Sequence, residues 1–448
     1  MHGTMNGRGR FRPRLTGSSA LALSTVVTNL MRIVSTMCLT RLLSPEVYGI
    51  TGMIMSVFYM INMVTDIGLQ SYVVRHERSD DPEFLSAVFT IHAVRGLVLA
   101  ATAALCAWPL SWLLAKPEIA LPLAVASLVF VIDGQVSLQQ FRALRDGRVQ
   151  RVTLIDIAMT FSQIVSAIIL AYFLRNVWAI VGSMIIASLA RLWAGYALFP
   201  GRRHRFRRDR EIAADLWRFS RVIALSSTLT LVLTQIDKLA MARILSLGQF
   251  GTYVIASSLA GAPQVFAFNY SSSIVYPAVA AAWREERSIA DAYYGCWGRF
   301  FYLYTFGGGA LIGVADLVVR LLYDPRYLPA ALYLSILSVS TAFIIVNRSM
   351  EAVQVATGRQ RVTVDFNIVR LVWLAGGGLL ALATMNAMIL VLTIGLIEVP
   401  VYGFSLFRMA RLHQIRWRRE ASLGLTLGAG FAVGAAASVA ARALFPTL

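Results

Sequence analysis

The stretch RLLSPEVYG, Arg41 to Gly49, has a near copy much later in the chain, RILSLGQFG, from Arg243 to Gly251. When the sequence is shifted by 202 residues, which places Arg41 on Arg243, eight of the 28 positions from Ala22 to Gly49 are identical. Each copy directly follows a long apolar run. The repetition indicates an internal duplication, and the apolar runs indicate what kind of unit was duplicated.

The composition indicates a membrane protein. Apolar residues make up 57% of the 448 positions and charged residues only 14%, whereas a soluble chain carries about 25% charged residues. The apolar residues cluster in stretches long enough to cross the hydrocarbon core as helices. We predict thirteen spans, at 17–40, 49–74, 84–108, 118–140, 152–174, 177–199, 217–242, 250–276, 298–321, 330–354, 362–384, 386–407 and 421–443.

The arginines predict the orientation. They concentrate in alternate loops and in the block RRHRFRRDR, Arg202 to Arg210. The positive-inside rule therefore places the N-terminus of this multi-pass membrane protein in the cytoplasm. The formal net charge of +18 is divided among loops that face anionic lipid, so we expect no nucleic-acid partner.

The predicted fold is all-α. Because each half holds six spans, an even number, both copies of the repeat have the same orientation, as in a pseudo-two-fold about the membrane normal with a cavity between two six-helix lobes. We therefore divide the chain into a basic cytoplasmic tail (1–14), an N-lobe (15–200), a basic cytoplasmic linker (201–216), a C-lobe (217–412), and a basic segment with one additional C-terminal helix (413–448).

The sequence contains no catalytic signature. A phosphate-binding GxxxxGK[ST], a zinc-binding HExxH and a nucleophile GxSxG are all absent. Cys38, Cys106 and Cys296 lie at unrelated positions, and the histidines are scattered. The glycine runs Gly307–Gly309 and Gly376–Gly378 fall inside apolar spans, where small residues allow close helix packing. We expect neither an enzyme nor a cofactor or metal.

Arg41 to Arg75 carries a family resemblance. Its turn, with Ser44, Pro45 and Gly49, and the later Asp66 and Gly68 resemble the second span of the Wzx-type polysaccharide and oligosaccharide flippases, members of the multidrug/oligosaccharidyl-lipid/polysaccharide superfamily. The segment QQFRALRDGRVQRVTLIDI, at 139–157, is similar to the basic loop of that family.

The resemblance implies a multi-pass flippase of the bacterial inner membrane, which translocates undecaprenyl-diphosphate-linked oligosaccharide units across that membrane for exopolysaccharide or surface-polysaccharide biosynthesis. It also implies alternating access and contact with membrane lipids, and it makes a polysaccharide polymerase and a chain-length regulator candidate partners. Two alternatives stay open. A multidrug or cation extruder of the same superfamily would favour an acid-rich cavity, and a membrane polysaccharide synthase would need larger extramembrane loops.

Arginines inside the spans are the candidate substrate-binding residues. Ionisable groups at membrane depth face a cavity or a partner, because leaving them in lipid is costly. A guanidinium also binds phosphate with two hydrogen bonds. We predict that Arg32, Arg95, Arg348 and Arg370 line a cationic central cavity. The alternative is a structural ion pair, which the spacing between Arg348 and Glu351 favours.

Two acidic residues are candidates for ion coupling. Glu398 lies well inside a span with no basic residue near it in sequence, and Asp66 lies near the inward surface. The alternative for Glu398 is a hydrogen bond to a neighbouring helix. Aromatic residues around the eighth and ninth spans predict an interfacial belt, formed by Tyr270, Tyr276, Trp283, Tyr293, Tyr294 and Trp297.

Overall fold

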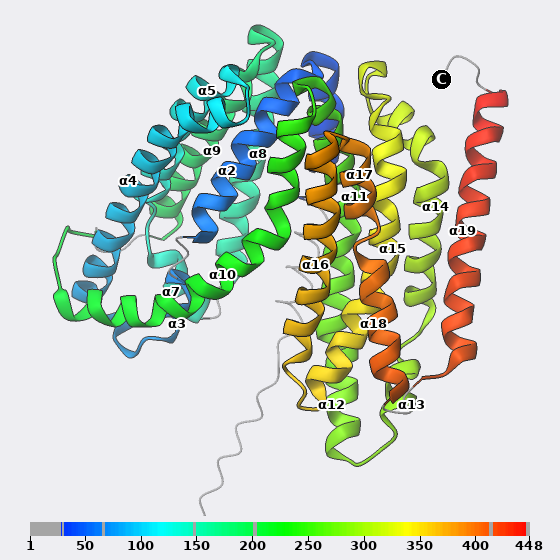
Figure 1. The fold of residues 1–448 in the computed structure, drawn as a ribbon. Coiled ribbons are helices and arrows are strands. Elements are labelled where there is room, and N and C mark those ends of the chain that lie inside the picture. Colours follow the sequence, from blue (N-terminus) through cyan, green and yellow to red (C-terminus); the bar gives the residue numbers. More distant parts are fainter. Residues whose placement is uncertain are drawn as a thin grey trace, which may run out of the picture.

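The computed structural model is a bundle of helices (Figure 1). It describes residues 28, 31–64, 68–146, 149–199, 204–411 and 415–444, with the side chains of 64, 149–150, 222–234 and 236 left out of the description. No strand occurs in these ranges. The predicted all-α membrane architecture is thereby confirmed. The basic tail (1–14) and Asp66 lie outside the described residues.

The helices follow one another along the chain with short connections. After a helical segment at 31–42 come α2 (Pro45–Val64), α3 (Leu69–Arg75), η1 (Glu77–Asp80), α4 (Pro82–Leu113), η2 (Pro117–Ile119), α5 (Ala120–Ala126), α6 (Leu128–Asp133), α7 (Gln139–Arg145), α8 (Val149–Leu174), α9 (Val177–Leu198), α10 (Arg210–Ile244), α11 (Leu247–Tyr270), the π-helical turn η3 (Ser271–Val275), α12 (Tyr276–Arg284), α13 (Ile289–Gly295), α14 (Arg299–Leu322), η4 (Pro325–Tyr327), α15 (Ala330–Ala356), α16 (Val362–Thr384), α17 (Ala387–Gly395), α18 (Glu398–Arg411) and α19 (Trp417–Leu444).

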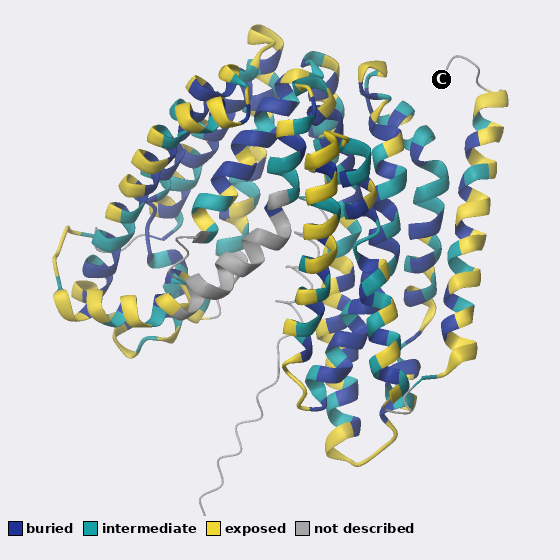
Figure 2. Ribbon diagram, viewed as in Figure 1, coloured by how far each residue is buried: buried dark blue, intermediate teal, exposed yellow. Residues whose placement is uncertain are grey.

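Among the described residues, nine helical segments are long and apolar enough to cross a bilayer. They coincide with nine of the thirteen predicted spans, including the additional one at the C-terminus. The predicted span 118–140 is divided among η2, α5, α6 and α7. The other three predicted spans, 17–40, 49–74 and 217–242, each contain residues or side chains that are not described. In Figure 2, exposed residues cover the outer faces of α16 and α19, as expected of helices that face lipid.

The chain forms two groups of helices, which Figure 1 shows side by side: α2 to α9 in one and α11 to α19 in the other. Helix α10 joins them. It begins at Arg210, inside the predicted linker, because Asp209 caps it by accepting hydrogen bonds from the amides of Glu211 and Ile212. Its first turns pack on the N-terminal group, where the Tyr72 hydroxyl donates to Asp215 at 2.8 Å. Its later turns contact α16 and α17.

The two groups meet closely where α2 crosses α11, and the repeated phrase lies at this crossing. A side chain on Gly49 would collide with the backbone of Leu247, and a side chain on Gly251 would collide with the backbone of Pro45. These two contacts exchange under the 202-residue shift, which maps Pro45 to Leu247 and Gly49 to Gly251. The positions that are identical in the two copies of the repeat therefore include the two glycines that allow the helices to approach each other.

A short segment of the C-terminal group also caps a helix of the N-terminal group. The guanidinium of Arg326 in η4 donates to the carbonyl oxygens of Thr40 and Arg41, both at 3.3 Å. The hydroxyl of Tyr327 donates to the carbonyl of Leu43 at 3.0 Å. These are the carbonyls that a helix leaves unpaired at its C-terminal end. Arg326 also donates to Asp324, and this hydrogen bond lowers the pKa of the Asp324 carboxyl.

The additional C-terminal helix α19 packs on α14 through glycines on both sides. Gly309 and Gly313 lie one turn apart on α14, and Gly430 and Gly434 do so on α19. Side chains on the two α19 glycines would collide with the carbonyls of Phe306 and Ala310. This double small-xxx-small arrangement lets two helix backbones approach in a membrane, where burial of apolar surface supplies little driving force.

We expect Gly434→Leu to lower the stability of the protein by about 1 to 3 kcal/mol, because the added side chain meets backbone that cannot rotate away. The matched control is Gly428→Leu on the same helix, where an added carbon meets nothing within 4 Å. Both variants gain the same helix propensity, so the comparison isolates packing. Thermal unfolding in detergent measures the difference, and equal melting temperatures would contradict the tight α14–α19 packing.

Candidate functional site

The site begins with a break between two helices of the C-terminal group. Pro400 lies in the first turn of α18 and has no amide hydrogen to donate to the carbonyl of Leu396. Its ring also crowds that carbonyl. The helix accordingly stops at Gly395 and resumes at Glu398. The break places the Glu398 side chain at a helix start, buried among α15, α16 and α18.

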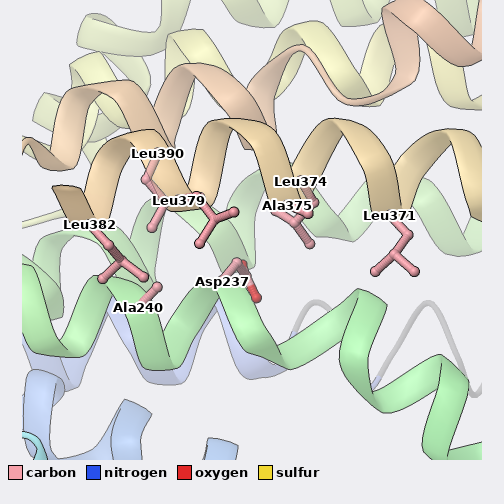
Figure 3. Close-up of a pocket in the computed structure, with 9 residues that line it drawn as sticks. Asp237, Ala240, Leu371, Leu374, Ala375, Leu379, Leu382 and Leu390 are labelled. Atoms are coloured by element: carbon pink, nitrogen blue, oxygen red, sulfur yellow. The ribbon is translucent and has the colours of Figure 1, made fainter. Parts of the chain in front are cut away.

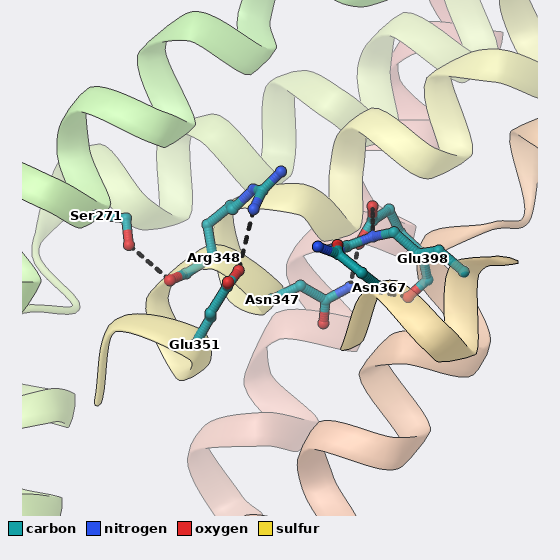
Figure 4. Close-up of polar contacts among 7 residues, drawn as sticks. Ser271, Asn347, Arg348, Glu351, Asn367 and Glu398 are labelled. Carbon is teal, nitrogen blue, oxygen red and sulfur yellow. Dashed lines mark hydrogen bonds and ion pairs between the residues drawn. The ribbon is translucent and has the colours of Figure 1, made fainter. Parts of the chain in front are cut away.

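Glu398 forms a buried ion pair with Arg370 of α16 (Figure 4). The Nε and Nη2 atoms of Arg370 donate to the two carboxylate oxygens at 2.9 and 3.1 Å. Asn347 of α15 donates to the same carboxylate at 2.7 Å and to the Glu398 carbonyl at 2.9 Å. Asn367 accepts from Arg370 at 3.1 Å. Two residues that the sequence analysis assigned to different roles, substrate binding and ion coupling, therefore bind each other.

A second ion pair joins Arg348 and Glu351, which lie three residues apart on α15. Arg348 donates through Nη1 to Glu351 at 3.0 Å, which is the local pair that the spacing favoured. Its side chain is 35% exposed, against 8% for Arg370. The carbonyl of Arg348 accepts from the Ser271 hydroxyl at 2.6 Å (Figure 4). Ser271 begins the π-helical turn η3, a local irregularity that often marks functional positions in helices.

Both arginines line a polar cavity of about 520 Å³. Helices α10, α11, α15, α16, α17 and α18 contribute its wall, which consists of Asp237, Lys238, Ser257, Ala260, Gly261, Gln264, Leu337, Ser340, Ile344, Arg348, Asn367, Arg370, Leu374, Ile394, Ile397 and Glu398. Hydroxyls and amides accompany the charged groups. A cavity with a few convergent polar groups between apolar helices is a typical ligand site.

The cavity wall carries charges of both signs. Glu398 neutralises Arg370 by direct contact, whereas among the described residues Lys238 donates to the neutral Gln235, at 3.3 Å. Asp237 accepts from the Tyr253 hydroxyl at 3.0 Å, and its second oxygen has no hydrogen-bond partner among the described residues. The ammonium of Lys238 and the half-exposed guanidinium of Arg348 are therefore the cations best placed to meet a ligand.

The other two predicted arginines, Arg95 and Arg32, are not among the described residues that line this cavity. Arg95 of α4 is half-buried, and its guanidinium donates to the carbonyl and side-chain oxygens of Asn62 at 3.4 and 3.5 Å. Arg32 is exposed on the helical segment 31–42. The structure thus brings together Arg348, Arg370 and Glu398, while Arg95 and Arg32 lie in the N-terminal group of helices.

Sequence reasoning missed one buried acid. Glu420 of α19 accepts hydrogen bonds from the hydroxyls of Tyr294 and Tyr402, each at 2.8 Å.

The predicted aromatic belt was wrong for Tyr270, Tyr293, Tyr294 and Trp297, which are buried in a core cluster beside these helices. Tyr276 and Trp283 are exposed, as a belt requires. The aromatics were misplaced because the short helix α13 folds them against α14 instead of extending along the bilayer surface.

Bilayer-length apolar helices around a polar, charged cavity define a multi-pass membrane protein with an internal polar cavity. Residues 38–332 match the model of a family described as polysaccharide biosynthesis protein. Because the match covers more than half of the chain, the protein belongs to this polysaccharide biosynthesis family.

Two curated relatives carry related descriptions. The succinoglycan biosynthesis transport protein ExoT of Rhizobium meliloti (strain 1021) is 25% identical over 58% of this chain and 53% of its own length. The lipopolysaccharide biosynthesis protein WzxC of Escherichia coli (strain K12) is 20% identical over 62% of this chain and 57% of its own length. The chain thus spans little more than half the length of these relatives.

The fold is shared with solved membrane transporters. The lipid II flippase MurJ, in an inward closed conformation, superposes with a TM-score of 0.70 at 10% identity, covering 96% of this chain and all of that one. An inward-facing multidrug resistance transporter of the MATE family superposes with a TM-score of 0.64 at 17% identity, covering 89% and 99%. These likenesses confirm the expected superfamily fold. The two-fold relation between lobes stays a prediction, supported here by the exchanged glycine contacts.

Proposed function

We propose that the protein is a flippase that moves undecaprenyl-diphosphate-linked oligosaccharide units across the bacterial inner membrane for exopolysaccharide or surface-polysaccharide assembly. The observation that carries the proposal is the cavity of about 520 Å³ with Lys238 and Arg348 in its wall, set among apolar helices. A diphosphate crossing the bilayer needs fixed hydrogen-bond donors to replace water. Family membership supports the same function. No catalytic step is part of this proposal.

Within this function we assign different tasks to the arginines. Arg348 and Lys238 contact the diphosphate or acidic sugars, because both present donors to the cavity. Arg370 shapes the site through Glu398 and Asn367 and stays bound to them. Arg95 and Arg32 contact the same substrate from the N-terminal helices when the protein alternates between its two open states.

The coupling role predicted for Glu398 fits its surroundings poorly. The Glu398 carboxylate already accepts two hydrogen bonds from the Arg370 guanidinium and one from the Asn347 amide, so fixed protein donors occupy both of its oxygens. Asp237 is the better candidate, since it lines the cavity and one of its oxygens has no hydrogen-bond partner in the described part of the chain. Asp66 remains a candidate that the structure does not describe.

The test is an assay of lipid-linked intermediates in cells. In a deletion strain we expect the oligosaccharide intermediate to be trapped on the cytoplasmic leaflet, and we expect the native protein to release it. Arg348→Ala, matched for membrane abundance, should lower surface polysaccharide about tenfold or more, as expected for the loss of one charge-assisted hydrogen bond. Arg348→Lys is the control that keeps the charge, and Arg95→Ala tests the N-terminal contact.

Two outcomes would contradict the proposal in different ways. If intermediates reach the outer leaflet normally without the protein, the flippase function is wrong, and extrusion of organic cations becomes the function to assay, in keeping with the acidic Asp237 in the cavity wall. If Arg348→Ala restores transport fully, the flippase function stands, but the guanidinium has only the structural task of binding Glu351.

A further inference from the structure

The three consecutive glycines of α16 have unequal surroundings. A side chain on Gly377 would collide with Thr393 of α17, so this glycine allows close helix packing. An added carbon on Gly376 or on Gly378 meets nothing within 4 Å. Packing between helices therefore explains only the middle glycine of the run. The open space beside Gly378 belongs to a cavity.

This second cavity has a volume of about 250 Å³ and lies between α10 and α16 (Figure 3). We call it the α10–α16 slot. Its wall consists of Asp237, Ala240, Leu371, Leu374, Ala375, Gly378, Leu379, Leu382 and Leu390. Five leucines face it, and among the described residues of its wall Asp237 is the one ionisable group. In Figure 3 the α16 leucines point toward α10 across the slot. Such a wall suits a hydrocarbon chain and offers almost nothing to a polar molecule.

The slot adjoins the polar cavity. Asp237 and Leu374 line both spaces, so the polar and apolar volumes share a wall at this point. A ligand that spans both would have a charged or polar end beside Lys238 and Arg348 and a hydrocarbon part beside the leucines of α16. The combination matches an amphipathic molecule and fits neither a free sugar nor a small cation.

The slot is also open toward the side of the bundle. Leu379 is 69% exposed and Leu382 is 41% exposed, although both line the slot. Only a small part of α16 is buried in the protein, and we infer that these exposed leucines meet lipid in a bilayer. A chain longer than the slot can therefore continue into the hydrocarbon core without leaving an apolar environment.

We propose that the α10–α16 slot binds a stretch of the polyprenyl chain of the lipid carrier while the diphosphate end lies in the polar cavity. The inference rests on the proposed flippase function and adds the location of the lipid chain. Gly378 is the position that keeps the slot open, and the paired Asp237 and Leu374 mark the junction between head and chain. An ordinary phospholipid acyl chain in the same slot is the competing occupant.

The test compares phenylalanine at two neighbouring glycines. Gly378→Phe places a ring in the slot, and Gly376→Phe adds the same ring on an exposed position of the same helix that does not line it. Ala240→Phe fills the slot from the opposite wall and serves as a second variant if Gly378→Phe is unstable. Each purified full-length protein is irradiated in lipid nanodiscs with a photoreactive polyprenyl phosphate, and labelled peptides are mapped by mass spectrometry.

We expect native protein and Gly376→Phe to be labelled within 371–382 and 237–240, and Gly378→Phe and Ala240→Phe to lose that labelling about tenfold. Each methylene excluded from an apolar site lowers affinity roughly fourfold, so excluding two accounts for this loss. Excess unlabelled polyprenyl phosphate should compete, whereas excess phospholipid should not. Competition by phospholipid alone, or equal labelling of Gly378→Phe and Gly376→Phe, would overturn the proposal.

The two proposals can fail separately. Slot labelling that survives competition by phospholipid, in a protein whose deletion leaves lipid-linked intermediates normally distributed, refutes the flippase function and leaves a polyprenyl site. Normal flippase behaviour in Gly378→Phe cells, together with unchanged labelling, refutes the slot and leaves the flippase function.

Discussion

Arg370→Ala should lower the free energy of unfolding by about 3 to 5 kcal/mol, the usual effect of removing one partner of a buried ion pair. The substitution leaves the Glu398 carboxylate in a site where it is only 4% exposed, with Asn347 as its one remaining side-chain donor in the described part of the chain. Such a loss is large against the total stability of a domain. We expect poor accumulation in the membrane and a clear drop in the melting temperature in detergent.

Two controls separate burial from charge in this experiment. Arg348→Ala removes the same type of side chain from a pair in which the arginine is 35% exposed and the glutamate 10%, so it should cost less than Arg370→Ala. The double variant Arg370→Leu with Glu398→Leu replaces the pair by apolar side chains and should recover most of the lost stability. If Arg370→Ala is as stable as Arg348→Ala, the Arg370–Glu398 contact does not hold these helices together.

Gly251→Leu is expected to have an effect of comparable size at the other important contact, the crossing of α2 and α11. The new side chain meets the carbonyl of Pro45, which is backbone, so one of the two helices must move. We expect the free energy of unfolding to fall by about 3 kcal/mol, at the upper end of overpacking effects. We also expect this variant to fail to restore surface polysaccharide in the deletion strain. Thermal unfolding and surface polysaccharide are the two measurements.

The control for the stability measurement is Gly261→Leu, at a position on α11 where an added carbon meets nothing within 4 Å. Gly261 lines the polar cavity, so this control applies to thermal unfolding and not to surface polysaccharide. A second substitution, Gly49→Leu, tests the exchanged contact, because it meets the backbone of Leu247. The two variants should be similarly destabilised if the repeats perform the same task. A harmless Gly251→Leu would show that α2 and α11 can separate without loss, contrary to the packing described here.

The sequence predicted the parts of this fold that depend on local pattern. Apolar runs predicted the bilayer-length helices, and the repeated phrase located the two equivalent glycines before any contact between them was known. The local pair Arg348–Glu351 was also foreseen, because its partners lie one turn apart. In each case the interacting residues are close in sequence or are related by a copied segment.

The contacts that the sequence did not predict join residues far apart in the chain. Arg370 and Glu398 belong to different helices separated by the whole of α17, so no helical spacing relates them. Pro400 was the available signal, since a proline inside an apolar run indicates a break and a break indicates exposed polar backbone. The slot beside Gly378 could not be predicted, because the sequence does not show which of three adjacent glycines faces a neighbouring helix.

The cap that Arg326 and Tyr327 place on the end of the 31–42 helix has a consequence for biogenesis. The hydroxyl of Tyr327 and the carbonyl of Leu43 are 284 positions apart in the chain. A ribosome that synthesises the protein from its N-terminus must therefore continue through Tyr327 before this helix end finds its donors. Until then, the carbonyls of Thr40, Arg41 and Leu43 lack the hydrogen-bond donors that η4 provides in the folded protein. The N-terminal group thus receives hydrogen-bond donors from the C-terminal group, and we expect the two groups to assemble as one unit.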